Sequence, residues 1–375
     1  VYYVKYTQTE EYIWQQYTDT PAEGFSACAG AYTANDVLRP YILRACYMDS
    51  DGQCSSKSGT VPASNVYEGV PARFKHSFSD DFFASRNRSD GMTFLSFADV
   101  TYMNEFMQLM LGMKGVSNNA KGYIQEIYYL TTVAANTGKS VIIAASDAWM
   151  LRVGSYISVG TQHSYESLEG CSIAYCVRIT RIEVSGDKAT VALDVPEDIT
   201  TNEGDCVTTV PYRNGACDDV LGTYGCFDLE GMTDKMAPFR FQNMEWGLGY
   251  DEIIVNMRCS STGDVTIAPD VSACTDLIAE DGWHPVGKMP AAGWIRDHGV
   301  SHGARIPTAT NATSTTGSCA YYMNSGAGRR GFAMRSRYGN ANSGVASVMT
   351  LPETNGGALV GSRASSIGHS VLAEQ

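Results

Sequence analysis

Apolar residues follow a helical spacing most clearly between Phe94 and Gly112. They recur at steps of three and four residues, which places them on one face of an α-helix. Ser96 and Asp99 stand at the two positions of an N-terminal capping box, in which side chains accept from the first backbone N–H groups of a helix. The pattern therefore predicts a core-facing helix over 94–112, capped at Ser96.

A second helical pattern runs over Asn119–Ala135 and is followed by Gly138, a residue type that commonly ends helices. The sequence Gly138-Lys139-Ser140 also matches the end of a phosphate-binding P-loop. That loop needs another glycine five residues before Gly138, and Val133 stands there. We therefore expect a helix that ends at Gly138, and no nucleotide site.

Short β-rich runs replace the helical spacing between Ser140 and about Val210. Ser185-Gly186-Asp187 separates two of these runs and is typical of a hairpin turn. A small β-barrel or sandwich, inserted between the helical region and the later part of the chain, explains this pattern best. The runs are Val141–Ile143, Tyr156–Val159, Ala174–Val184 and Ala189–Val195. Near the N-terminus, Val1–Thr7 and Tyr41–Met48 are also predicted as strands.

Beyond Gly231 the chain loses regular periodicity, and Gly, Ser, Asn and Thr dominate. Trp246, Trp283 and Trp294 are nevertheless spread through this part. Ordering such a segment costs conformational entropy that only contacts with other residues can offset. We therefore expect it to fold against the rest of a domain rather than to act as a linker.

Length and composition indicate a folded, loop-rich protein of two or three domains. The chain has 375 residues, and single cores rarely extend beyond ~250–300 residues. It contains 22 Tyr and 37 Gly. Tyr supplies stiff contact area with a polar tip and Gly permits irregular loops, as in binding surfaces, although a Tyr-rich core is the alternative interpretation.

The charge balance disfavours two classes of partner. The formal net charge is -13, whereas a nucleic-acid phosphate backbone or an anionic membrane surface attracts clustered Lys and Arg. No apolar run approaches the ~20 residues of a membrane span. We expect no nucleic acid as partner and no membrane insertion.

The sequence predicts no metal and no cofactor. His298 and His302 have a zinc-like spacing for a helix, but they lie in Gly-rich sequence that does not favour one. The 11 cysteines form no CxxC pair, and their odd number favours mostly reduced thiols over a secreted disulfide scaffold. A partial set of disulfides, for example among Cys28, Cys46 and Cys54, stays open.

Nothing in the sequence predicts catalysis. Three acidic pairs occur, Asp80-Asp81, Asp218-Asp219 and Asp251-Glu252, but no pattern places a catalytic partner opposite them. Solvated faces or helix N-termini are the expected roles. The motifs of serine hydrolases, zinc proteases and papain-like proteases do not appear.

Three stretches, in a fixed order, carry a family resemblance. They are Met92–Phe106, Pro238–Tyr250, and Phe332–Ala346 with its continuation Val360–Ala364. They resemble, in this order, the helix-bearing first segment, the "Glu, Asn, Trp-Gly" segment and the terminal segment of formylglycine-generating-enzyme-type C-type lectin domains. Such domains end receptor-binding proteins of phage tails, including target proteins of diversity-generating retroelements. The family's two glycines are replaced by Arg335-Ser336, and its tryptophan by Tyr338.

The resemblance implies an α+β fold, namely a C-type-lectin-like domain of small antiparallel sheets with two helices. The implied organisation is an N-terminal Tyr/Cys-rich attachment segment (1–60), the first part of the C-type-lectin-like domain (61–138), an inserted β-rich domain (139–230) and the second part of the C-type-lectin-like domain (231–375). The enzyme branch of the family needs two redox cysteines near the terminal motif. Only Cys319 follows Cys274 here, so we expect no enzyme.

By position in the terminal motif, the resemblance predicts a set of exposed ligand-binding residues. Arg363 is instead expected to make internal contacts beneath the site. Tyr offers stacking area, and Asn offers paired donor and acceptor groups. The predicted site consists of Arg337, Tyr338, Asn340, Asn342, Glu353, Thr354 and Asn355, joined by Tyr321, Tyr322 and Asn324. Tyr321 and Tyr322 as mere core residues are an equally weighted alternative.

The function implied by the resemblance is receptor binding by a phage virion protein. The expected partners are a host-cell surface protein or glycan, other virion proteins and further copies of the chain in a homotrimer. The expected location is the phage tail, after assembly in the bacterial cytoplasm. The alternatives are a structural decoration protein of the virion and a binding protein displayed on a bacterial cell surface.

Overall fold

The computed structural model describes residues 2–8, 13–28, 43–50, 57–62, 77–87, 92–97, 99–102, 105–106, 128–164, 168–209, 213–215, 217–218, 239–241, 243–246, 251–301, 304–310, 320–321, 330–334, 348–352, 360–361 and 364–366. They form small, mostly antiparallel sheets with few helices, which is compatible with the predicted α+β class. Within these ranges no helix is long and apolar enough to cross a membrane.

The largest open sheet is built around one central strand, β15 (Asp251–Cys259). Its neighbours are β16 (Asp264–Ile267), β17 (His284–Lys288), β22 (Arg330–Met334), β23 (Val348–Pro352) and β24 (Val360–Gly361). β16 and β22 flank β15 in antiparallel pairing, and β24 pairs with its first two residues in parallel. β17 and β23 extend the sheet on either side. Strands that are far apart in the sequence therefore meet on β15.

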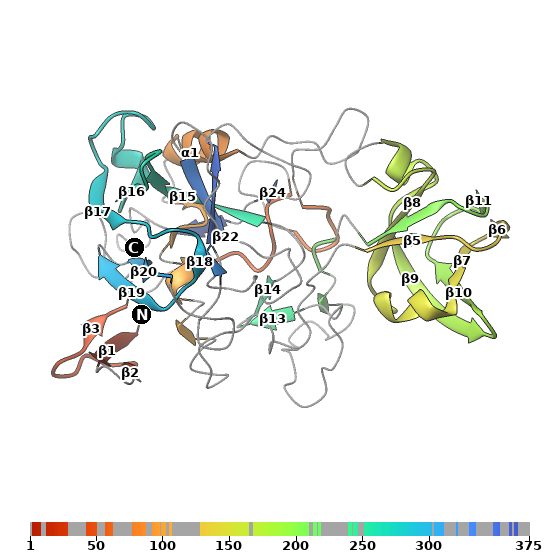
Figure 1. The fold of residues 1–375 in the computed structure, drawn as a ribbon, viewed down its shortest axis with the longest axis horizontal. Coiled ribbons are helices and arrows are strands. Elements are labelled where there is room, and N and C mark those ends of the chain that lie inside the picture. Colours follow the sequence, from red (N-terminus) through yellow and green to blue (C-terminus); the bar gives the residue numbers. More distant parts are fainter. Residues whose placement is uncertain are drawn as a thin grey trace, which may run out of the picture.

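Helix α1 (Phe78–Arg86) covers one face of this sheet (Figure 1). Phe78 and Phe82 are buried in one apolar core with residues of β15 and with Trp283. The helix approaches β22 closely because residue 331 is glycine, where a Cβ would collide with the ring of Phe78. Residues 252–259 of β15 are all buried in this arrangement, including the polar Glu252, Asn256 and Arg258.

Helix α1 was not predicted from the sequence, although its start carries a recognisable signal. The Ser77 hydroxyl oxygen accepts the backbone N–H of Asp80 at 3.1 Å, which is half of a capping box. Asp80 and Asp81 lie in the first turn, the helix N-terminal role expected for this acidic pair. Their charge is favourable beside the positive end of the helix dipole.

Two strands from distant parts of the chain pair with each other. β4 (Met92–Phe94) pairs in antiparallel register with β25 (Ala364–Ser366). The backbone then turns toward β15, where the carbonyl of Leu95 accepts the N–H of Val255 at 2.9 Å. The pairing holds two stretches about 270 residues apart in the sequence against the same sheet.

The predicted helix after Ser96 is confirmed at the described positions 97, 99–102 and 105–106. Its capping box is confirmed as well. The Asp99 carboxylate accepts the Ser96 N–H at 2.9 Å, and the Ser96 hydroxyl oxygen accepts the Asp99 N–H at 3.2 Å. The predicted start at Phe94 was wrong, because Met92–Phe94 is drawn into strand β4. Residues 107–112 lie outside the described ranges.

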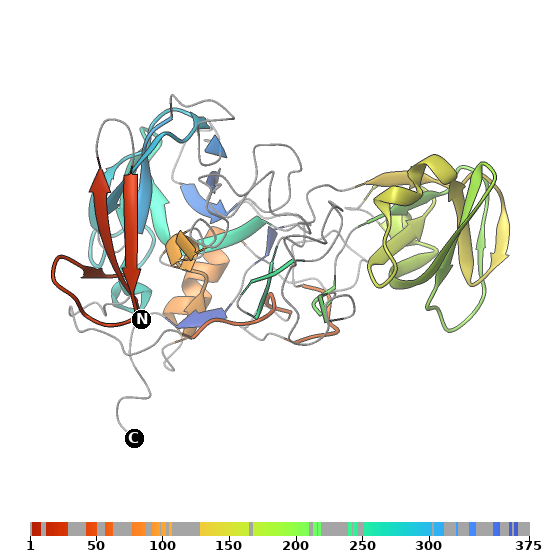
Figure 2. The same ribbon diagram turned by 90° about the horizontal axis from the view of Figure 1, so that it is seen from below.

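A closed β-barrel is formed by a continuous stretch of the chain. Its strands are β5 (Tyr129–Thr131), β7 (Ser140–Ala144), β8 (Tyr156–Gly160), β9 (Ala174–Ser185), β10 (Lys188–Leu193) and β12 (Cys206–Thr208). They pair in the order β5-β12-β8-β9-β10-β7, and an antiparallel bridge between Thr132 and Ile143 closes the ring. In Figures 1 and 2 the barrel lies at one end of the long axis, and β15 lies toward the other.

The barrel confirms the four predicted β-runs and the hairpin turn after Ser185, where Gly186 has a φ of 61°. Alternation explains the fold: Val141, Ile143, Ala189 and Val191 point into one closed core. Two short strands, β6 (Asn136–Gly138) and β11 (Ile199–Thr201), pair beside it. The 3-10 helices η1 (Ala145–Met150) and η2 (Leu168–Cys171) connect its strands.

The second predicted helix was wrong over its described part. Residues 129–131 form β5, and Gly138 ends strand β6 rather than a helix. The physical reason is tertiary: Leu130 is buried in the barrel core and pairs with Val207. That long-range pairing outweighs the local helical spacing. Residues 119–127 of this prediction lie outside the described ranges.

A small N-terminal sheet packs against the helix that follows Ser96. Its strands, in the order β2-β1-β3, are β1 (Tyr3–Gln8), β2 (Ile13–Thr18) and β3 (Ser26–Ala27). Tyr2 contacts the rings of Tyr102 and Phe106, with centroids 5.6 and 4.7 Å away. β1 confirms the predicted N-terminal strand. The prediction over Tyr41–Met48 was wrong at 43–48, which form bends and an isolated bridge instead.

The remaining described elements are short. They are the hairpin β13 (Phe239–Phe241) and β14 (Met244–Trp246), the pair β18 (Gly293–Trp294) and β21 (Ala320–Tyr321), the pair β19 (Asp297–Ser301) and β20 (Ala304–Ala309), and the 3-10 helix η3 (Val271–Ala273). Arg258 holds the segment between η3 and β17 by stacking on Trp283 at 4.2 Å and donating to the Ala279 carbonyl. The part beyond Gly231 therefore contains more regular strands than its sequence pattern indicates.

The barrel core gives a direct stability test. Ile143→Ala removes a fully buried side chain and should lower the free energy of unfolding by ~2–5 kcal/mol, because it leaves a cavity. Val184→Ala, in the same barrel but 60% exposed, should change it by less than ~0.5 kcal/mol. Urea denaturation of the whole chain measures both. Equal effects would contradict the assigned barrel interior.

Candidate functional site

The structure places the ends of the predicted site segments and not the site residues themselves. Arg337, Tyr338, Asn340, Asn342, Glu353, Thr354, Asn355, Tyr322 and Asn324 all lie outside the described residues, as does Arg363. Tyr321 is the exception, because its backbone pairs with Gly293 between β21 and β18.

Two of the predicted segments are connected to the central sheet. Residues 335–347 join Met334 of β22 to Val348 of β23, and these two residues are register partners. Residues 353–359 join Pro352 of β23 to Val360 of β24, which pairs with β15. The sheet therefore fixes both ends of each segment.

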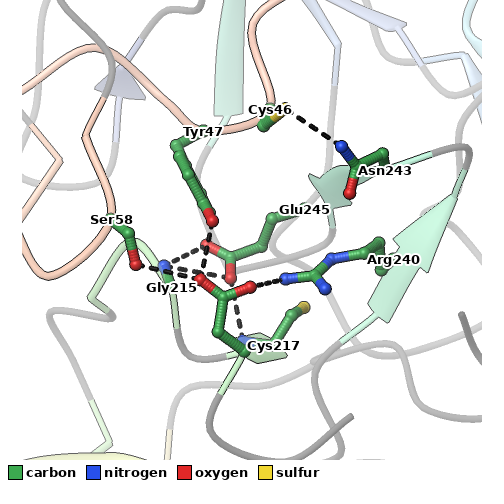
Figure 3. Close-up of polar contacts among 9 residues, drawn as sticks. Cys46, Tyr47, Ser58, Gly215, Cys217, Arg240, Asn243 and Glu245 are labelled. Atoms are coloured by element: carbon green, nitrogen blue, oxygen red, sulfur yellow. Dashed lines mark hydrogen bonds and ion pairs between the residues drawn. The ribbon is translucent and has the colours of Figure 1, made fainter. Parts of the chain in front are cut away.

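The densest polar cluster among the described residues lies elsewhere, where four segments of the chain meet (Figure 3). Asp218 is its centre. Its carboxylate accepts the hydroxyl protons of Tyr47 at 2.6 Å and Ser58 at 2.9 Å, and it forms an ion pair with Arg240. Arg240 is buried, and burial of a charge is tolerated when a partner of opposite charge is adjacent.

A second carboxylate, Glu245, faces the same cluster from the opposite strand of the β13/β14 hairpin, where it is the register partner of Arg240. Glu245 is fully buried. It accepts the backbone N–H groups of Gly215 at 3.0 and 3.1 Å and of Cys217 at 2.8 Å. Its own N–H donates to the Cys46 carbonyl at 2.8 Å. The hairpin is thereby joined to two other segments of the chain.

A buried amide completes this connection. Asn214 accepts the N–H of Met48 at 3.2 Å and donates to the Met48 carbonyl at 2.9 Å. The backbone of Asn214 also exchanges hydrogen bonds with Gly59 and Thr60. Residues 43–50, 57–62 and 213–218 are thus held as one unit with the β13/β14 hairpin. We refer to Tyr47, Ser58, Asn214, Asp218, Arg240 and Glu245 as the polar clamp.

The protonation states of the polar clamp follow from its contacts. Burial alone would raise the pKa of Asp218, but hydrogen bonds from Tyr47, Arg240 and Ser58 together hold that pKa below its usual value. Burial, and then the hydrogen bond to Asp218, raises the pKa of Tyr47 to about 12. Burial raises the pKa of the Cys217 thiol well above its ordinary value.

These states give the polar clamp a structural role. Asp218 stays ionised and its oxygens accept from three side chains, while Glu245 accepts backbone N–H groups. Cys217 stays a neutral thiol, and a nucleophile would need the thiolate. The cluster therefore holds segments together and has no evident reactive group.

Sequence reasoning did not select these residues for this role. Asp218 was expected on a solvated face or at a helix N-terminus; it lies in a short helical turn at 217–218, and its carboxylate also forms the ion pair with Arg240. A usable signal was present: Arg240 lies between two phenylalanines in Phe239-Arg240-Phe241, and a charge inside an apolar strand requires a partner. Glu245 belongs to the segment that carries the family resemblance, which gave it no structural role.

The described residues provide no evident metal centre. Among them, no group of three or more His, Cys, Asp or Glu side chains is placed so that it could hold a metal ion. His298 lies in strand β19, opposite Pro307, and not on a helix, while His302 is not described. Cys28 and Cys274 are thiols, and burial raises the pKa of each, to about 12 for Cys274.

Comparison of the chain with protein-family models and with curated protein sequences finds no match.

The polar clamp makes stability dependent on pH. The pKa of Asp218 is lower in the folded protein than in the unfolded chain, so its contribution is fully present above the unfolded pKa and is lost as pH falls through the folded one. Asp218→Asn should cost ~1–3 kcal/mol at pH 7 and flatten this acid limb. Unfolding free energies between pH 7 and pH 3 measure it. The exposed turn variant Asp187→Asn is the control, and an Asp218→Asn profile identical to wild type would contradict the role.

Proposed function

We propose that this chain is a receptor-binding protein of a phage virion, in which a C-type-lectin-like domain presents its terminal segments to a host-cell surface protein or glycan. The observation that carries the proposal is that strands in or directly beside the three resembling stretches pair with one another. β4 pairs with β25, while β15, which comes directly after the second stretch, pairs with β22 and with β24. A domain whose early and late strands pair with each other beside one central sheet is what the resemblance implies.

The proposed binding surface consists of the terminal segments between the strands of the central sheet. Tyr338, Asn340 and Asn342 belong to the segment between β22 and β23, and Glu353, Thr354 and Asn355 to the segment between β23 and β24. A sheet that fixes the ends of a segment allows its side chains to vary without loss of the fold. This is the property that a target of a diversity-generating retroelement requires.

A homotrimer is part of the proposal. A single site of this kind binds weakly, and linked sites raise the overall affinity by ~10²–10⁴ when they engage together. The N-terminal segment is the proposed attachment to other virion proteins. Figure 2 shows the small N-terminal sheet at the far end of the molecule from the barrel, which leaves the barrel clear of that attachment.

The cysteine chemistry supports binding rather than catalysis. A formylglycine-type activity needs a reactive cysteine pair close to the terminal motif. Cys274 is 1% exposed, and burial raises its pKa to about 12. A thiol in that state is a poor nucleophile, since the thiolate is the reactive form.

The proposal predicts that the terminal segment determines binding to host cells. The double variant Tyr338→Ala with Asn342→Ala should weaken binding of the whole chain to host cells or to a printed glycan panel by about tenfold or more, because contacts of this kind dominate interfaces. The matched control is Trp14→Ala with Gln16→Ala, an aromatic and an amide exposed on β2. Equal binding by wild type and the terminal variant would remove these residues from the site, and no binding by wild type to any cell or glycan would favour a structural virion role.

A further inference from the structure

One histidine on the outer surface of the barrel is fixed in place although it is exposed. His163 lies just after strand β8, and both of its ring nitrogens have partners. Nδ1 lies 3.2 Å from the Cys206 sulfur, and Nε2 lies 3.2 Å from the Thr131 hydroxyl oxygen. The ring of Tyr129 meets the imidazole edge to face, with centroids 5.9 Å apart.

The direction of these hydrogen bonds follows from the thiol. Burial raises the pKa of Cys206 to about 11, so the thiol keeps its proton at neutral pH and can donate it to Nδ1. With Nδ1 as the acceptor, the ring proton lies on Nε2, where it can donate to the Thr131 oxygen. These two contacts orient the imidazole without burying it.

The surface around His163 combines aromatic and hydroxyl groups. Tyr129 and Thr131 alternate with the buried Leu130 along β5, so both project from the outside of the barrel. Tyr129 is 39% exposed, and Thr131 is exposed as well. An ordered ring on a surface costs side-chain entropy that burial usually offsets, so this arrangement is suited to a ligand that meets a preorganised surface.

The charge of the barrel limits the ligand class. Residues 129–209 contain ten Asp and Glu against five Lys and Arg, so an anionic ligand would meet repulsion. The Tyr129 and Thr131 side chains themselves carry no charge at neutral pH. A neutral sugar ring has an apolar face that stacks on aromatic side chains and a rim of hydroxyls that pair with hydroxyl groups and imidazole.

We propose that Tyr129, Thr131 and His163 form a binding site for neutral sugars on the outside of the barrel, separate from the terminal segments of the central sheet. The site does not depend on the terminal segments, and it gives the barrel a recognition role of its own. Within the proposed receptor-binding function it would add a second contact on the same host surface. Its affinity for a single sugar is weak, as expected for a small exposed site.

The test uses the whole chain and three neutral trisaccharides, maltotriose, chitotriose and mannotriose, observed by saturation-transfer NMR and by titration. At least one sugar should bind wild type and shift the His163 ring signals. His163→Ala and Tyr129→Ala should each weaken that binding by about tenfold, because they remove the stacking surface. Thr131→Val, which retains the side-chain shape, should weaken it through the lost hydroxyl.

Two controls separate this site from the terminal segments and from loss of fold. Val184→Ala, exposed elsewhere on the barrel, and the terminal variant Tyr338→Ala with Asn342→Ala should both retain sugar binding. Melting temperatures identify any variant that fails to fold, and Thr131→Val then decides the result. Absence of binding by wild type, unchanged binding in folded variants of the three residues, or loss in the terminal variant alone would each overturn the barrel site. The last of these would leave the proposed receptor-binding function intact.

Discussion

Strand β15 is the constraint on which the larger part of the molecule depends. It is buried along residues 252–259, and it pairs with β16 from the adjoining hairpin and with β22 and β24 from much later in the chain. Each of the later pairings closes a long loop, and the entropy of closure must be offset by burial of apolar side chains. Phe78, Phe82 and Trp283 supply that burial on one face. β4 depends on the same strand, because Leu95 and Phe97 bond to Val255 and Asn256.

The barrel and the polar clamp are held together in different ways. The barrel closes its own strands and contains its own core, so it needs few contacts outside residues 129–209. The clamp uses Asp218, Arg240 and Glu245 to hold segments that carry few regular strands among their described residues. A rigid sheet with anchored segments is a suitable support for a recognition surface, which is the basis of the proposed function. The oriented His163 makes the outside of the barrel a second candidate for recognition.

Predictions succeeded where an element has a signal in its own residues, and failed where pairing with residues far away in the chain decides the structure. The capping box joins Ser96 and Asp99, three residues apart, and the strands around Val141 and Val191 are visible as local runs of β-favouring residues although they pair with each other across 50 positions. Both predictions are confirmed. Leu130 and Gly138 were assigned to a helix because their spacing allows one, but pairing with Val207 and Ile199 decides their structure. Such pairings have no local signature.

The same limit applies to the functional residues. Arg240 between two phenylalanines was a visible anomaly, whereas its partner Asp218 could not be chosen among three similar acidic pairs. The contact of His163 with Cys206 joins residues 43 positions apart and obeys no motif. The terminal residues from Arg337 to Asn355 rest on the family resemblance, and the structure supplies the strands on either side of them.

Hydrogen–deuterium exchange of the whole chain, read by mass spectrometry on peptides that cover β4, β15, β22 and β25, addresses the central claim most directly. If the β4/β25 pair and the sheet around β15 form one cooperative unit, their amides should exchange slowly and lose protection together as urea is added, because each pairing supports the others. Rapid exchange of β25 and β22 while β15 and β4 stay protected would contradict the account, since the terminal part would then have no sheet to hold it.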